Sequence, residues 1–268
     1  MNQKIIPPFG KKVDLKDYDA RYVGPKKDKN QIREETIENL KRLRLLQEMF
    51  YAEGKRSLLV VLQATDTGGK DGTIRHVFRG VNPQGVQVTS FKQPSTEELS
   101  HDFLWRIHQH TPPKGYIGVF NRSHYEDVLV VRVKNIVPKQ VWSKRYQIIN
   151  NFEESLVING ITVLKFFLHI SKDEQKKRLE ARRDDPKKQW KFSVDDVEKR
   201  AFWDDYVKAY EDVLTKCNTK HAPWHIVPAD NKWYRNFIIS STIADKLEQM
   251  NPKFPKAEKG IEKMVVPD

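Results

Sequence analysis

The chain alternates short apolar runs with segments in which apolar residues recur every three or four positions. The runs predict β-strands, and the recurring spacing predicts α-helices with one buried face. The predicted strands are residues 58–63, 86–91, 115–120, 161–170 and 224–228. Helices are predicted at about 31–53, from 72, from 94, at about 138–158, at 171–183, from 193 and at 231–250. This alternation predicts an α/β fold with a mainly parallel five-stranded sheet.

Three of these helices have apolar positions at clear helical spacing, which predicts their buried faces. The face predicted for the first helix is Ile37, Leu40, Leu43, Leu46 and Phe50. The face predicted for the helix from 94 is Leu99, Phe103 and Ile107. The face predicted for one long helix from 193 is Phe202, Tyr206, Tyr210, Val213 and Cys217.

A glycine-rich turn with one lysine joins the first strand to the following helix. The segment Ala64–Thr73 partly matches the P-loop pattern G-x-x-x-x-G-K-[ST], in which backbone N–H groups, a helix N-terminus and a lysine bind phosphate. Ala64 stands where the pattern has its first glycine, and Asp71 where it has Ser or Thr. An ordinary strand–helix turn with a surface lysine is the alternative. The phosphate-binding candidates are Gly68, Gly69, Lys70, Asp71, Gly72 and Thr73.

Polar side chains follow the first and third strands, at the sheet edge where α/β proteins bind ligands. Asp66 would repel bound phosphate unless it held a cation, so Mg²⁺ binding is a natural role for it. After the third strand, acids can hold the metal and Arg122 can bind phosphate through two hydrogen bonds. A turn aspartate and an ordinary polar loop are the alternatives. The candidates after the third strand are Asn121, Arg122, Glu126 and Asp127.

A basic loop at about 182–192 joins two predicted helices. Such a loop can close over bound phosphates and neutralise charge in the transition state. Its candidate cations are Arg182, Arg183, Lys187 and Lys191. Arg132, Lys144 and Arg145 are further candidates for an anion channel. Solvated surface charge is the alternative for each of them.

Composition narrows the class of protein. The 268 residues include 38% hydrophobic and 31% charged residues, which is typical of a soluble globular protein. No apolar run is long enough to span a membrane, and the N-terminus lacks the apolar centre of a secretory signal. The single cysteine fits a reducing cytoplasm. The net charge of +12 indicates a polyanionic partner, such as nucleic acid, anionic lipid or polyphosphate.

The predicted organisation has three parts. Residues 1–30 form an irregular N-terminal arm that we expect to pack on the rest of the molecule. Residues 31–250 form the main domain, which includes the basic loop. Residues 251–268 form a basic tail with little potential to build a core.

Three motifs together resemble the polyphosphate kinase 2 family. They are Asp66–Thr73, Phe120–Val128 and Arg182–Lys191, and the resemblance extends from about residue 10 to 250. It implies a three-layer P-loop kinase fold similar to thymidylate kinase, with a helical lid. It also implies phosphoryl transfer between inorganic polyphosphate and purine nucleotides with Mg²⁺ or Mn²⁺, and homo-oligomers that are tetramers or dimers.

By the resemblance, Asp66 would bind metal and Lys70 phosphate, while Arg122 and the lid cations Arg182, Arg183 and Lys187 would hold phosphates. Class one members have Asp where this chain has Asn121, and Asn-Arg where it has Glu126-Asp127. The motif here resembles class three, whose members phosphorylate both AMP and ADP. This shifts the expected metal ligands to Asp66, Glu126 and Asp127.

The predicted mechanism places Asp66, Lys70, Arg122, Asp127 and Arg183 in one catalytic crevice, with Lys70 facing Arg183. The terminal phosphate oxygen of the nucleotide would attack in line, and positioning and charge neutralisation would supply most of the rate. The alternatives are an ATP-dependent nucleoside monophosphate kinase and a non-catalytic nucleic-acid-binding protein. The chain has no recognisable nucleic-acid motif, so nucleic acid and membranes are not the expected partners.

Overall fold

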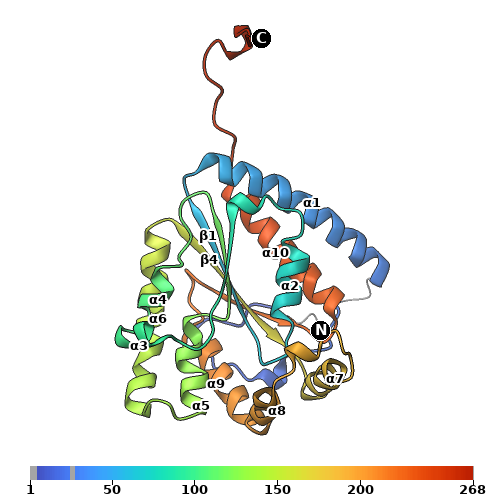
Figure 1. Ribbon diagram of the computed structural model, residues 1–268, viewed down its shortest axis with the longest axis vertical. Coiled ribbons are helices and arrows are strands. Elements are labelled where there is room, and N and C mark those ends of the chain that lie inside the picture. The colour runs from blue at the N-terminus through green and yellow to red at the C-terminus, as the bar shows by residue number, and fades with distance from the viewer. Residues whose placement is uncertain (1–4, 25–27, 268) are drawn as a thin grey trace.

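The centre of the molecule is a parallel β-sheet (Figure 1). The computed structural model describes residues 5–24 and 28–267, and in these the sheet has five strands in the order β2-β3-β1-β4-β5. All four strand pairs are parallel. The strands are β1 (Ser57–Gln63), β2 (Val86–Ser90), β3 (Ile117–Asn121), β4 (Ile161–His169) and β5 (Trp224–Pro228). The predicted strands and the α/β class are therefore confirmed.

Helices cover both faces of the sheet and give the fold three layers. The bounds are α1 (Lys29–Glu53), α2 (Lys70–Val77), α3 (Thr96–Ser100), α4 (Trp105–His108), α5 (Val130–Val133), α6 (Lys139–Ile158), α7 (Lys172–Arg183), α8 (Val194–Ala201), α9 (Trp203–Lys216) and α10 (Lys232–Met250). Helices α1, α2 and α10 lie on one face, and α4, α5, α6 and α9 lie on the other (Figure 1). Short 3₁₀ turns are η1 (Leu15–Asp17), η2 (Pro83–Gly85), η3 (His124–Val128), η4 (Gln189–Lys191) and η5 (Ile261–Lys263).

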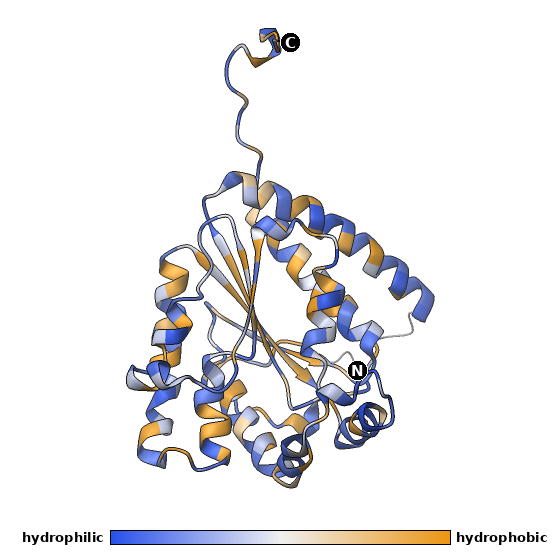
Figure 2. Ribbon diagram, in the orientation of Figure 1, coloured by the Kyte–Doolittle hydropathy of each residue, from blue (hydrophilic) through white to orange (hydrophobic). Residues whose placement is uncertain are grey.

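Strand β1 shows why two cores form. All of its residues are buried, and successive side chains point to opposite faces. Leu58, Val60 and Leu62 belong to the core beneath α1 and α10, whereas Leu59 and Val61 belong to the core beneath α6 and α9. Figure 2 shows the strands as mainly hydrophobic and α7 as largely hydrophilic. A strand buried on both faces is a continuous apolar run, as the sequence indicates.

Two predicted helices are each broken in the structure. The helix expected from residue 94 is two short helices, because His101 is extended and the Asp102 carboxylate accepts from Leu104 N, which starts a new turn. Leu99 is consequently exposed. The helix expected from 193 bends at Phe202, which separates α8 from α9. The bend turns α8 across the mouth of the candidate site and leaves Phe202 partly exposed.

The buried face of α1 also differs from the predicted one. Leu43 and Phe50 are buried as expected, but Ile37 is 54% exposed. The remaining buried positions of the face are Ile32, Thr36, Asn39 and Gln47. The face turned to α10 is thus more polar than the apolar spacing suggests. Thr36 can be buried there because its hydroxyl donates to Ile32 O of the same helix at 2.7 Å.

The described part of the N-terminal arm packs on the main domain. Leu15 N donates to Glu211 Oε1 at 2.9 Å, and Ile226 N donates to Ile5 O at 2.8 Å. Of the arm predicted at 1–30, residues 1–4 and 25–27 lie outside the described residues, as does residue 268 of the tail. From residue 251 the tail runs away from the body of the molecule (Figure 1). Within the described residues, no helix is both long and apolar enough to cross a bilayer.

Candidate active site

The glycine-rich turn between β1 and α2 has the backbone geometry of a phosphate-binding loop. Gly69 has a φ of 102°, and a Cβ there would lie 2.1 Å from Arg235 Nη1. A Cβ on Gly68 would lie 2.4 Å from the Ala64 Cβ. Both positions therefore require glycine, for space at each and for conformation at Gly69. Gly69 is also the N-cap of α2 without a side-chain cap, so the first N–H groups of the helix are available to an anion.

Lys70 follows the turn and lies almost entirely within the protein. Its Nζ donates to Ala64 O at 3.0 Å. Burial and the nearby Arg122 charge lower the pKa of Lys70 to about 8, against the opposing effect of Asp66, Glu126 and Asp71. The lysine is thus folded against its own loop, ready to exchange a backbone carbonyl for a phosphate oxygen.

Asp66 lies among three cations, Lys70, Arg122 and Lys199. Arg122 Nη2 lies 3.1 Å from Asp66 Oδ1, and Lys199 Nζ lies 3.3 Å from Asp66 Oδ2. Burial raises the pKa of Asp66, but the charges of Lys70, Lys199 and Arg122 outweigh it, and the pKa is lower than usual. The side chain is therefore an anion at neutral pH, able to face a metal ion once phosphates draw its cations away.

Arg122 has a strained backbone. Its φ of 64° lies in the left-handed region, which is uncommon for a residue other than glycine. Its N–H donates to Leu62 O at 3.1 Å, which ties the end of β3 to β1. The guanidinium lies beside the glycine-rich loop, with Nη2 3.1 Å from Asp66 Oδ1, and backbone strain of this kind is common at functional sites.

Asn121 and Asp71 contact each other. Asn121 Nδ2 donates to Asp71 Oδ1 at 2.9 Å, and Lys191 Nζ from η4 lies 3.2 Å from Asp71 Oδ2. Asp71 therefore links the loop, the end of β3 and the lid. Asn121 is the residue for which the sequence leaves a metal role open, and here it acts as a hydrogen-bond donor.

Both members of the acidic pair after β3 line a cavity beside Asp66. Asp127 Oδ1 also accepts from Arg145 Nη1 at 2.9 Å. Burial raises the pKa of Asp127 to about 6, although Arg145 and Arg106 oppose the shift. Of the three residues predicted to form an anion channel, Arg132, Lys144 and Arg145, it is Arg145 that reaches the site.

The lid residues predicted to act together are dispersed. Arg182 Nη1 lies 3.5 Å from Asp196 Oδ2, and Lys191 reaches Asp71 as described above. Arg183 is exposed and pairs with Asp184 at 2.7 Å. Lys187 is also exposed. The expectation that Lys70 and Arg183 share one crevice is wrong for this conformation, because Arg183 is at the C-terminal end of α7, on the solvent side. Lys199 and Lys191 make the contacts across the site instead.

Two other candidate anion-binding residues lie outside the cavity. Arg132 Nη1 pairs with Asp212 Oδ2 at 2.5 Å, and its guanidinium lies 4.7 Å from the centre of the Trp142 ring. Lys144 is exposed on α6, one residue before the inward-pointing Arg145. The structure therefore does not bring Arg132 or Lys144 to the residues that line the cavity.

A cavity of about 650 Å³ opens beside the start of the loop, over residues 64–66. One part of its wall is apolar and aromatic: Phe91, Leu129, Val130, Ile136, Val137, Trp203, Tyr206 and Tyr210. The other part is ionic: Asp66, Arg106, Arg122, Glu126, Asp127, Lys134, Arg145, Asp195 and Lys199. This combination suits an amphipathic ligand with a flat ring system and an anionic group.

The far end of the loop faces a different group of cations. Arg178 donates to Thr67 O and Gly68 O, and it also pairs with Glu174 at 2.7 Å. Arg235 is buried on α10, its Nη1 has no hydrogen-bond partner, and it packs against Gly69. Burial and the Arg178 charge lower the pKa of Arg235 to about 10. A buried cation without a counter-charge indicates a place for an anionic ligand.

Sequence reasoning missed four of these residues. Lys199 and Lys134 lie in or before predicted helices with no motif, and only the fold brings them to the cavity. Arg178 lies in the middle of a predicted helix and belongs to no motif. Arg235 does leave a signal, because it interrupts the apolar positions of the last helix, next to Tyr234 and before Ile238 and Ile239.

The parallel order β2-β3-β1-β4-β5, with a lysine-bearing glycine loop after the central strand and a helical lid, defines a P-loop kinase. Comparisons with known proteins then identify the family. The family model described as Polyphosphate kinase 2 (PPK2) matches residues 26–255, and the chain belongs to this family.

Individual relatives agree with this assignment. The chain is 55% identical over 226 residues to the AMP/ADP-polyphosphate phosphotransferase of Meiothermus ruber, covering 84% of this chain and 85% of that protein. It is 46% identical to the ADP-polyphosphate phosphotransferase of Rhodopseudomonas palustris, with 92% and 90% covered. The crystal structure of polyphosphate kinase 2 from Arthrobacter aurescens superposes with a TM-score of 0.93 at 43% identity, covering 97% of this chain and 93% of that one.

Proposed function

We propose that this protein transfers phosphate from inorganic polyphosphate to AMP and ADP, with Mg²⁺ or Mn²⁺ as cofactor. The family and the names of the relatives support the reaction. The observation that carries it is the pair of different environments at the two ends of one phosphate-binding loop. An amphipathic cavity lies at one end, and buried Arg235 lies at the other.

The cavity suits the nucleotide. Its aromatic wall, with Trp203 and Tyr206, can cover a base, and Arg122 and Lys199 can receive the phosphates beside Asp66. The terminal phosphate of AMP or ADP is already anionic, so no strong base is needed to activate it. Positioning against the loop and neutralisation of charge would provide most of the rate.

The far end of the loop suits the phosphate donor. Arg235 has an unused donor against Gly69, and α2 offers its first N–H groups there. A polyphosphate end at this place would satisfy the buried guanidinium and bring its last phosphorus toward the cavity. Lys70, between the two ends, would exchange Ala64 O for the transferred phosphate.

Mg²⁺ would be held by few protein ligands. In the described residues no group of three or more His, Cys, Asp or Glu side chains is arranged to hold a metal ion. Mg²⁺ in phosphotransferases is bound by one or two carboxylates together with substrate phosphates and water, and Asp66 with Glu126 fits that pattern. Bound there, the ion would neutralise charge on the phosphates. Asp127 is already paired with Arg145, which makes it a weaker candidate ligand.

The lid would close through lysines rather than through Arg183. Lys191 already contacts Asp71, and Lys199 contacts Asp66 and Asp195. When phosphates enter, both lysines can turn from carboxylate to phosphate without leaving the site. Arg182 and Lys187 would join only after further closure of the lid.

The test is a transfer assay with polyphosphate as the sole donor. Purified protein with AMP or ADP, long-chain polyphosphate and Mg²⁺ should form ADP and then ATP without any added ATP. Lys70→Met, checked for folding by circular dichroism, should lose roughly 100-fold or more of the rate, because it removes a charge aimed at the phosphate. Transfer that requires ATP as donor would instead identify a nucleoside monophosphate kinase. A gel shift with nucleic acid and no transfer would identify a binding protein.

Assembly and compartment stay predictions. We propose a homo-oligomer, tetramer or dimer, because α1 exposes Ile37 and Leu45, at 54% and 56%. Light scattering after size-exclusion chromatography would give the number of subunits. The single, buried Cys217 supports a reducing cytoplasmic location, which fractionation of cells would test.

A further inference from the structure

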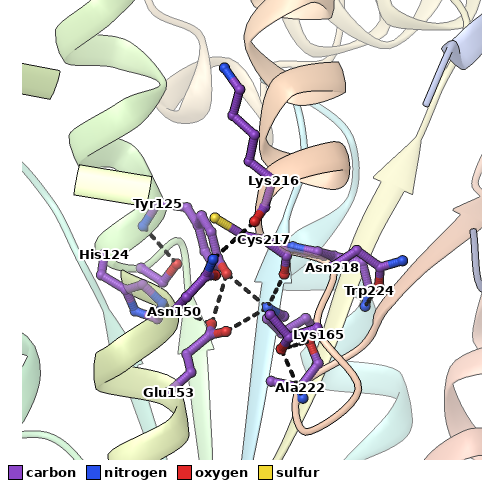
Figure 3. Close-up of polar contacts among 12 residues, drawn as sticks. His124, Tyr125, Asn150, Glu153, Lys165, Lys216, Cys217, Asn218, Ala222 and Trp224 are labelled. Carbon is purple, nitrogen blue, oxygen red and sulfur yellow. Dashed lines mark hydrogen bonds and ion pairs between the residues drawn. The ribbon is translucent and has the colours of Figure 1, made fainter. Parts of the chain in front are cut away.

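A network of buried ionisable groups lies beneath the acidic turn η3, outside the cavity (Figure 3). Glu153 on α6 and Lys165 on β4 are both fully buried, and Lys165 Nζ lies 2.6 Å from Glu153 Oε2. Lys165 also donates to Cys217 O at 2.7 Å. The pair thus joins α6, β4 and the end of α9 within the core.

The remaining contacts of this pair go to two neighbouring residues of η3. Tyr125 Oη donates to Glu153 Oε1 at 2.8 Å and accepts from Lys165 Nζ at 2.8 Å. His124 Nε2 lies 3.1 Å from the same Glu153 Oε1. One carboxylate therefore fixes two consecutive side chains of the turn from below.

The charge states are defined by this arrangement. Burial raises the pKa of Glu153, but Lys165 and His124 outweigh it, and the pKa lies below its usual value. Burial lowers the pKa of His124, against Glu153, so the ring is neutral at neutral pH. A carboxylate acceptor then requires the proton on Nε2, and Nδ1 is left buried without a partner. In this orientation His124 makes a hydrogen bond through only one of its two ring nitrogens.

The turn carries candidate catalytic groups on its other side. His124 and Tyr125 point into the core, and the next two residues are Glu126, which lines the cavity, and Asp127, which binds Arg145. Arg122 is two residues before His124. A rotation of His124 and Tyr125 would therefore move the groups that face the ligand.

A purely structural purpose does not require ions here. Replacing a buried ion pair by apolar residues of similar volume is often neutral or stabilising. Directional contacts to a turn achieve what apolar packing cannot, because they specify one orientation. This network also contacts the turn at two points, which fixes its rotation as well as its depth.

We infer that Glu153 and Lys165 are positioning residues for phosphoryl transfer, which act through Tyr125 and His124 to set the place of Glu126 and Arg122. The inference rests on the proposed function. Neither Glu153 nor Lys165 is proposed to contact substrate. Both residues hold the orientation of the turn η3, whose other residues supply the substrate contacts.

Two variants test it. Tyr125→Phe keeps the ring and removes the hydroxyl that joins both members of the pair. The double variant Glu153→Gln with Lys165→Met keeps the volume and removes both charges together. We expect kcat to fall by about 10-fold or more in each, with the KM for ADP within about threefold, because small misplacements of reacting groups mainly slow the chemical step. If the double variant does not fold, Tyr125→Phe carries the test alone.

Two control variants separate positioning from stability. Leu43→Ala opens the core on the opposite face of the sheet and should lower the melting temperature while keeping kcat at a temperature where it is folded. Tyr146→Phe removes a hydroxyl on α6 that accepts from Arg132 and does not contact the turn. Its kcat should stay within about twofold of the unaltered protein, since no candidate catalytic group moves.

Hydrogen exchange gives a readout that does not depend on activity. Amides of residues 122–129 should exchange faster in Tyr125→Phe and in the double variant, and at the unaltered rate in both controls. Unchanged exchange, together with kcat within twofold in folded Tyr125→Phe, would overturn the inference. An unaltered protein without polyphosphate-dependent transfer would refute the proposed function instead, and faster exchange of the turn would still support its attachment to the pair.

Discussion

The two ends of the glycine-rich loop differ in how their buried cations are compensated. At the cavity end, three of the lining cations contact acids: Arg122 and Lys199 contact Asp66, and Arg145 contacts Asp127. At the far end, Arg178 pairs with Glu174, but Arg235 bonds only the amide oxygen of Asn236 and its Nη1 has no partner.

This difference suggests how each end selects its ligand. A site whose cations are largely paired with acids favours a ligand that brings its own cation, as a nucleotide with Mg²⁺ does, because the Mg²⁺ offsets most of the negative charge that the nucleotide adds. An unbalanced site favours a bare polyanion, because the ligand supplies the missing counter-charge. Inorganic polyphosphate, with about one negative charge per phosphate, is such a ligand. Four changes test the contrast, from the largest expected effect to the smallest.

Asp66→Asn should nearly abolish transfer. The variant leaves Arg122 and Lys199 without their common carboxylate and removes a proposed metal ligand, so we expect kcat to fall by roughly 100- to 1,000-fold. Initial rates across a range of Mg²⁺ concentrations would measure this. A rate restored fully by excess Mg²⁺ would restrict Asp66 to metal affinity, and an unchanged rate would remove it from the site.

Arg235→Met should weaken the binding of polyphosphate and raise the stability of the protein without ligand. We expect the KM for polyphosphate to rise by about 10-fold and the KM for ADP to change little, because a charge-assisted contact is lost at one end only. The free energy of unfolding without ligand should rise by roughly 1 kcal/mol, since a buried charge is removed whose only hydrogen bonds are to the neutral amide of Asn236.

Arg178→Met provides the matched control for that variant. Arg178 holds Thr67 O, Gly68 O and Ala229 O, so its loss should lower stability instead of raising it. Thermal melts with and without tripolyphosphate would compare the two. If Arg235→Met has a lower melting temperature than the unaltered protein and an unchanged KM for polyphosphate, Arg235 stabilises the fold and does not bind the donor.

Polyphosphate affinity should fall by several-fold as pH rises through about 8. The pKa of Lys70 is lowered to about 8 by burial, so the folded protein loses this proton well before an ordinary lysine would. The sign for stability is opposite: the unfolded chain holds the proton to about 10.5, so this group opposes folding below pH 8 and ceases to do so at higher pH. Calorimetric titration of tripolyphosphate between pH 6.5 and 9.5 would measure the change. Lys70→Met should show no inflection there, and the same inflection in that variant would assign it to another group.

Salt should have the smallest effect, and it should be unequal at the two ends. Raising ionic strength to about 0.3 M shortens the screening length, which weakens capture of a long anion by uncompensated charge. We expect the KM for polyphosphate to rise a few-fold and the KM for ADP by less than about twofold, because the cavity charges are paired and partly buried. Equal salt dependence for both substrates would contradict the contrast.

The sequence was sufficient wherever a property depends on neighbouring residues. Residues 58–62 had to be a buried strand because every position is apolar and can pack on either face of the sheet. Gly68 and Gly69 had to be glycines because the turn admits no Cβ. These features predicted the sheet, the phosphate-binding loop and the acids after β3.

The sequence could not predict which acid each lysine or arginine contacts. Arg183 and Lys199 are both charged residues on or beside the lid, and the spacing along the chain cannot tell them apart. The bend at Phe202 turns Lys199 toward Asp66, while the end of α7 leaves Arg183 in solvent. Arg132 and Arg145 differ in the same way, since one faces Asp212 and the other faces the cavity.

By itself the sequence determined the fold, the family and the glycine-rich loop proposed to bind phosphate, because backbone conformation and burial follow from residue types a few positions apart. Tertiary structure alone decided which charges meet: Lys199 with Asp66, Arg145 with Asp127, and Glu153 with Lys165 beneath η3. Those pairings join residues from separate elements, and a long side chain takes its direction from the packing of its element, which no local pattern records.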